Sequence, residues 1–206
     1  MGYWGYFVVG RGERPLGEYA ALAGVSELRP YRSAPGGWQV WEYPGGDGEI
    51  GSMNALALES GAPALFGYVM DSACVVVEAA APESGAWSSC LVRAAMAGYL
   101  GAESEGLTLE DYFLEPRDAA ERAVAWAAEA GHTVGARDLV EVFIAGAGDG
   151  RGAGGGVAGG ADASGASEAS DASHASDAEP LAEALFFRLL DRLGVVPYTP
   201  YAPYAP

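Results

Sequence analysis

Cys90, His132 and Asp138 are the residues of this 206-residue chain whose types would allow nucleophilic catalysis. A helical pattern that begins near Trp87 predicts Cys90 in the first turns of a helix, where the positive end of the helix dipole lowers the pKa of a thiol. His132, in the turn after a later helix, would act as the base, and Asp138 or Glu141 would orient it. This set predicts a cysteine-dependent hydrolase or transferase as one alternative function.

The same residues also have a purely structural interpretation. Leu91 and Ala94 beside Cys90 indicate a small apolar core residue, and His132 fits a solvated helix cap. The chain contains no lysine, and its other histidine, His174, lies in a tract of Gly, Ala, Ser and Asp. Schiff-base chemistry, a lysine-dependent phosphate loop and a two-histidine metal site in a folded region are therefore excluded. We expect neither cofactor nor metal and favour a protein that is not an enzyme.

The charge of the chain indicates which partners it can approach. Its 28 acidic residues face 11 arginines, which gives a net charge of -17 at pH 7. Such a charge repels nucleic-acid phosphates and anionic lipid headgroups, so we expect neither nucleic acid nor a membrane as partner. Another protein with a basic surface is the natural complement. The alternative is that the acidity serves solubility alone.

Aromatic residues and arginines gather in the first 43 residues, on segments that we predict as strands. Side chains of these two kinds anchor many protein interfaces. The residues that we predict as the binding surface are Trp4, Trp38, Trp41, Arg29 and Arg32. They favour a protein-binding module, such as an inhibitor, an immunity protein or a regulatory protein. A small-ligand-binding domain, with its pocket between sheet and helices, is a third alternative.

The elements that must position these residues follow an alternating order. The sequence predicts strands over 3–9, 28–32, 38–43, 64–70 and 74–79, with helices over 15–23 and 52–60. A turn at Pro35-Gly36-Gly37 is expected between the second and third strands, and a tight hairpin at Asp71-Ser72 between the last two. This is the order βαββαββ, and from Trp87 onward the pattern becomes helical. Thr108 and Asp111 resemble a capping box, a helix is expected over 116–130, and 139–145 fits either a helix or a strand. We predict an α+β fold, with a mixed or antiparallel sheet and a helical C-terminal half packed against it.

Composition divides the chain into four parts. Residues 1–145 have the length and pattern of one globular domain. Residues 146–178 are nearly all Gly, Ala, Ser and Asp, which predicts a disordered linker or an expanded loop. Residues 179–196 form an amphipathic helix that docks on the core of the same chain or serves as a tethered binding element. Residues 197–206 repeat Pro-Tyr-X, either as a polyproline II recognition element or as a disordered tail.

Cysteine usage and hydropathy indicate the compartment. Cys74 and Cys90 are the only cysteines, and the N-terminal residues read as a strand rather than a signal peptide. We therefore expect a cytoplasmic protein with two buried free thiols. No apolar run approaches the roughly 20 residues that a membrane helix requires.

Overall fold

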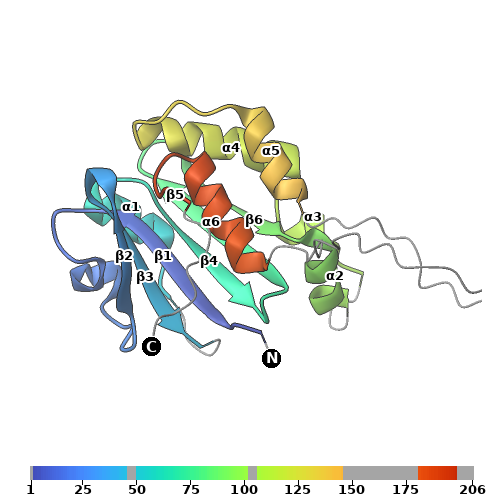
Figure 1. Ribbon diagram of the computed structural model, residues 1–206, viewed down its shortest axis with the longest axis horizontal. Coiled ribbons are helices and arrows are strands. Elements are labelled where there is room, and N and C mark those ends of the chain that lie inside the picture. Colours follow the sequence, from blue (N-terminus) through green and yellow to red (C-terminus); the bar gives the residue numbers. More distant parts are fainter. Residues whose placement is uncertain (1, 46–49, 102–105, 146–180, 199–206) are drawn as a thin grey trace, which may run out of the picture.

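One antiparallel sheet of six strands, in the order β2-β3-β1-β4-β5-β6, organises the protein (Figure 1). The computed structural model describes residues 2–45, 50–101, 106–145 and 181–198. Helices accompany the sheet mainly in the C-terminal half, which confirms the predicted α+β class. The strands are β1 (Gly5–Arg11), β2 (Arg29–Ala34), β3 (Trp38–Pro44), β4 (Ala64–Met70), β5 (Cys74–Ala81) and β6 (Gly85–Leu91). The helices are α1 (Met53–Ser60), α2 (Arg93–Gly101), α3 (Leu109–Tyr112), α4 (Pro116–Glu129), α5 (Ala136–Ile144) and α6 (Ala182–Arg192).

Turn residues determine how the strands of the first half are joined. A short 3-10 turn over Pro35–Gly37 joins β2 to β3, and Gly36 has a φ of 74°, which only glycine adopts without strain. Asp71 and Ser72 join β4 to β5 with φ values of 51° and 53°. Short polar side chains tolerate this left-handed region better than most, which explains why the hairpin was predictable. Both connections are confirmed as the sequence predicts them.

The prediction of one continuous helix over 15–23 is wrong. The chain forms two 3-10 turns, η1 (Leu16–Glu18) and η2 (Ala20–Leu22). Tyr19 lies between them with an extended backbone, φ -77° and ψ 139°, so the helical hydrogen bonds cannot continue through it. The carboxylate of Glu59, in α1, accepts hydrogen bonds from the backbone N–H groups of Ala20 and Ala21 and holds the second turn against α1.

The helix expected to begin near Trp87 is also wrong, because this segment is the sixth strand. Residues of β6 pair with β5 from Gly85 to Leu91. Trp87, Ser89 and Leu91 are buried beneath the helices on one face, and Cys90 is buried on the other. The strand ends at Val92, whose φ is 58°, and α2 begins at the next residue.

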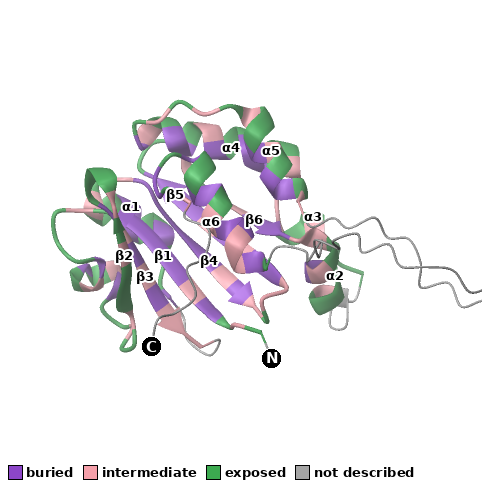
Figure 2. Cartoon of the chain, in the orientation of Figure 1, coloured by how far each residue is buried: buried purple, intermediate pink, exposed green. Residues whose placement is uncertain are grey.

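Two layers cover the sheet, as the buried residues of Figure 2 indicate. The helices α4, α5 and α6 pack on one face and enclose the larger core, which includes Trp38 and Trp126. On the other face, α1 and the two 3-10 turns enclose a second core around Val8 and Leu56. Alternation along β1 explains the division, since Phe7 and Val9 belong to the first core and Val8 to the second.

The helix α6 lies on the sheet beside β4 and β5. Its residues Leu185, Phe186, Leu189 and Leu190 are buried in the larger core. The Phe186 ring lies directly on Gly67 of β4, where a side chain would occupy the same space. The predicted linker over 146–178 and the Pro-Tyr residues 199–206 lie outside the described residues. Within the described part of the chain, none of the helices is long and apolar enough to span a membrane.

Candidate functional site

A groove runs along the edge strand β6, between that strand and the helices α3 and α4. Its volume is about 760 Å³. The lining residues are 86–88, 110–115, 118, 121 and 122. Three stretches that are distant in the sequence therefore build one concave surface, and their side chains decide what it can bind.

A short segment between α3 and α4 forms one wall of the groove by binding the edge of β6. The backbone N–H of Leu114 donates to the carbonyl of Ser88, and the Ser88 hydroxyl donates to the carbonyl of Tyr112. Farther along the strand, Arg122 of α4 donates to the carbonyl of Ala86. These bonds occupy backbone groups that an edge strand would otherwise offer to another chain.

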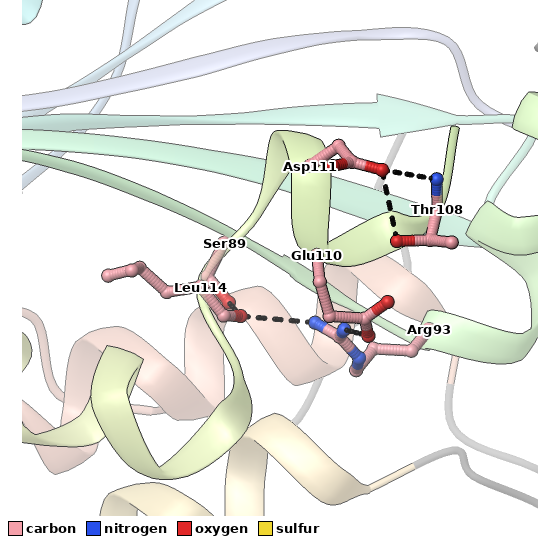
Figure 3. Close-up of polar contacts among 6 residues, drawn as sticks. All are labelled: Ser89, Arg93, Thr108, Glu110, Asp111 and Leu114. Atoms are coloured by element: carbon pink, nitrogen blue, oxygen red, sulfur yellow. Dashed lines mark hydrogen bonds and ion pairs between the residues drawn. The ribbon is translucent and has the colours of Figure 1, made fainter. Parts of the chain in front are cut away.

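Arg93 and Asp111 fix the helix α3 in place, as Figure 3 shows. Arg93 donates to the carbonyl of Leu114 and forms an ion pair of 2.7 Å with Glu110. Asp111 accepts hydrogen bonds from the backbone N–H and the hydroxyl of Thr108, so the predicted capping box is confirmed. The backbone amide of Glu110 itself, the Thr108 hydroxyl and Arg93 lower the pKa of the Glu110 carboxyl. This wall therefore keeps its negative charge well below neutral pH.

The charge that lines the groove is strongly negative. It comprises the five carboxylates of residues 110, 111, 115, 118 and 121 against the single guanidinium of Arg122. Glu115, Asp118 and Glu121 are exposed, and within the described part of the chain they form no ion pair. Glu115 and Asp118 lie at the start of α4, where the helix dipole favours negative charge. Besides Asp111, which accepts the hydrogen bonds of the capping box, the groove therefore presents three carboxylates that form no ion pair among the described residues.

The structure contradicts the predicted position of Cys90. Cys90 lies on β6, three residues before α2 begins, and not in the first turns of a helix. It is fully buried with Cys74 and Met96 in a small cluster on the face of the sheet that α2 covers. Burial raises the pKa of Cys90 to about 11 and that of Cys74 to about 12, because the charged thiolate is poorly solvated there. Both cysteines are free thiols.

The other members of the predicted catalytic set do not meet Cys90. His132 follows α4 on the opposite face of the sheet, where its ring packs against Gly194. Asp138 is exposed in the first turn of α5, and Glu141 lies 3.9 Å from Arg137 on the same helix. Among the described residues, no hydrogen bond joins His132 to either carboxylate. The geometry that a nucleophile, a base and an orienting acid require is therefore not formed.

Thiol labelling checks this arrangement in solution. At pH 8, a thiol with a pKa near 11 is ionised in about one molecule in a thousand, against about a quarter of molecules for free cysteine. We expect iodoacetamide to modify Cys74 and Cys90 only after unfolding in urea, as read by mass spectrometry. Equal modification of Cys90 with and without urea would contradict its burial.

The three predicted binding tryptophans do not form one surface. Trp38 is 2% exposed and packs against Trp126 in the larger core, so it cannot contact a partner. Trp41 lies on the other face of the sheet, where its indole N–H donates to the side-chain oxygen of Gln39. Trp4 is 40% exposed and contacts Tyr68 and Tyr99. Positions 38 and 41 differ by an odd number, and strand alternation therefore sends their side chains to opposite faces.

The two predicted binding arginines lie on β2, on the face that carries α6. Arg29 forms an ion pair of 3.0 Å with Glu42, which is 6% exposed and also accepts a hydrogen bond from the Tyr3 hydroxyl. Arg32 lies over the Phe187 ring, 5.2 Å from its centroid. Burial and the nearby Glu42 carboxylate raise the pKa of Tyr3, so its hydroxyl stays a hydrogen-bond donor. Arg29 therefore has a structural role, and Arg32 belongs to a surface shared with α6.

The sequence interpretation missed the groove. From the sequence alone, Glu110 and Asp111 fit a simple solvated acidic face, and the segment from Trp87 fits a helix. Period-two burial over 87–91 is the signal that could have identified the strand and its edge. Within the described residues, no cluster of three or more His, Cys, Asp or Glu side chains could hold a metal ion.

Comparison with known proteins gives no functional assignment, since no family model, no curated protein and no solved structure matches this chain. The function must therefore be argued from the groove and from the surfaces of the molecule itself.

Proposed function

We propose that this chain is a protein-binding module whose acidic groove holds a basic segment of another protein. The observation that carries the proposal is the set of three exposed carboxylates, Glu115, Asp118 and Glu121, which line one groove without ion-pair partners among the described residues. An inhibitor, an immunity protein or a regulatory protein would act by binding a segment of its partner in this way. The net charge of -17 supports the same choice, because it speeds the approach of a basic partner and repels acidic ones.

The apolar residues of the groove suit the side chains that such a segment would carry. Phe113 and Leu114 are half-buried and add apolar surface to the lining. Arginine and lysine place an aliphatic stem on apolar surface while the charged group reaches a carboxylate or water. Arginine is favoured over lysine, because its planar guanidinium forms two parallel hydrogen bonds with one carboxylate.

Neutralising the groove tests the proposal. The variant Glu115→Gln, Asp118→Asn, Glu121→Gln removes three charges that form no internal ion pair among the described residues, so the fold should persist. With nona-arginine as the probe, we expect the affinity in isothermal titration at 0.1 M salt to fall about tenfold, since three exposed charge pairs contribute roughly 0.5 kcal/mol each.

A matched control separates the groove from total charge. Glu13→Gln, Glu18→Gln, Glu27→Gln also changes the net charge from -17 to -14, at exposed positions before β2. These residues follow β1 in the chain, and β1 lies three strands from β6 in the sheet, a separation of about 14 Å. This separation exceeds the Debye length of about 10 Å at 0.1 M salt. This control should weaken binding less than twofold. An equal loss in both variants would mean that the probe senses total charge, and the groove would then not be the binding site.

A further inference from the structure

Independently of the groove, we propose that a strip formed by Tyr31, Arg32 and Phe187, the α6–β2 strip, binds the chain's own Pro-Tyr repeat at residues 199–206. Tyr31 and Arg32 both pack on the Phe187 ring. The Tyr31 and Phe187 rings are 5.8 Å apart with an interplanar angle of 27°, and the Arg32 guanidinium lies 5.2 Å from the Phe187 centroid. Phe7 supports the strip from below, 5.1 Å from Phe187.

The course of the chain after α6 leads toward this strip. Leu193, Val195 and Val196 are buried, and the backbone N–H of Tyr198 then donates to the Asp191 carboxylate at 2.9 Å. Tyr198 therefore lies beside the last turn of α6, and the chain has reversed its direction. Asp191 and Phe187 are four residues apart and so are neighbours on one side of the helix. A chain that continues past Asp191 along this side next meets Phe187.

The remaining segment is long enough to cover the strip. From Asp191 to Glu183, near the start of α6, the helix rises about 12 Å at 1.5 Å per residue. Eight residues of polyproline II helix extend about 25 Å. The segment 199–206 can therefore follow α6 over its length and pass Tyr31 and Arg32 on the way.

The chemistry of the strip matches a segment with this sequence. Proline occurs at positions 200, 203 and 206 and tyrosine at 201 and 204, a period that matches the three residues per turn of polyproline II. Proteins that recognise such helices use aromatic surfaces on which the proline rings pack. Tyr31 is 40% exposed and Phe187 is half-buried, so both rings offer such a surface.

Substituting the repeat in the full-length chain tests the proposal without altering the core. We expect Tyr201→Ser, Tyr204→Ser to shift the backbone amide signals of Tyr31, Arg32 and Phe187 in ¹H–¹⁵N spectra of the labelled protein. Trp4 and Tyr99, an exposed aromatic pair that does not contact the α6–β2 strip, are the internal control and should not shift. A synthetic peptide of residues 197–206 should restore the signals at about millimolar concentration, the effective concentration of a short tether.

Three results would overturn the proposal. The first is an unchanged spectrum in the substituted chain, which means that the repeat does not contact the strip. The second is a shift at Trp4 and Tyr99 instead, which places the repeat on a different aromatic surface. The third is a loss of the wild-type signal positions on tenfold dilution, because only the repeat of a second copy would depend on concentration.

Discussion

Trp126→Ala is expected to lower the free energy of unfolding by about 3–5 kcal/mol, the usual cost of deleting a large aromatic side chain from a core. Trp126 is fully buried in the second half of α4 and packs against Trp38 at a centroid distance of 5.8 Å. Its removal leaves a cavity between the helical layer and the sheet. The change would be measured by urea unfolding followed by circular dichroism.

The indole N–H of Trp126 adds a second contribution that can be separated from packing. It donates to the carbonyls of both Ala64 and Ala80, at 3.2 and 2.9 Å, which are paired residues of β4 and β5. Trp126→Phe keeps an aromatic ring but leaves these acceptors without this donor. We expect this variant to lose about 1–3 kcal/mol, the cost of an unsatisfied buried group, in addition to a smaller packing loss.

Arg117→Ala is the matched control for α4, because Arg117 is exposed on the same helix. Substitutions at such positions change the stability by less than about 0.5 kcal/mol. A loss of less than about 1 kcal/mol in Trp126→Ala would mean that α4 is not held on the sheet by this side chain.

The parts of the fold that could be predicted are those that local chemistry determines. Gly61, at a φ of 67°, ends α1, and Ser52 caps its start by accepting a hydrogen bond from the backbone N–H of Ala55. Asp71 and Ser72 form the predicted hairpin. In each case, the residue type prefers a backbone conformation whatever surrounds it, so the sequence was sufficient.

The strand β6 could not be predicted, because its assignment depends on distant residues. Leu91 and Ala94 have a spacing that also fits a helix face, and the apolar residues from Trp87 onward do not distinguish the two. Pairing with β5 and burial under α4 and α5 favour the strand conformation for this segment. The error moved Cys90 from a helix start to a strand interior and gave it a reactivity that its buried site does not support.

The groove could not be predicted from the sequence for the same reason. It forms because Leu114 binds the backbone of Ser88 and because Arg122 binds that of Ala86, contacts between residues 26 and 36 positions apart in the chain. No local pattern encodes these contacts. The acidic residues were visible in the sequence, but their gathering on one concave surface was not.

Phe186→Ala is expected to lower the free energy of unfolding by about 3–5 kcal/mol. The effect of a second substitution, Gly67→Ala, should depend on whether the Phe186 ring is present. Gly67 of β4 lies under the Phe186 ring, and a Cβ there would lie 2.5–2.8 Å from three ring carbons. The ring cannot move away easily, since it is fully buried and stacks with Phe7 at 6.2 Å. Gly67→Ala alone should therefore cost about 1–3 kcal/mol through overpacking.

The two substitutions together should cost less than the sum of their separate effects. Once Phe186→Ala has removed the ring, the methyl group of Gly67→Ala fills part of the cavity, so its cost of about 1–3 kcal/mol should vanish or reverse. Gly98→Ala is the control, because nothing lies within 4 Å of a Cβ at this exposed position in α2. It should stabilise the helix by about 0.5–1 kcal/mol. Additive losses in the double variant would mean that α6 does not dock on β4 of its own chain in solution, since a coupling this large requires direct contact between the two positions.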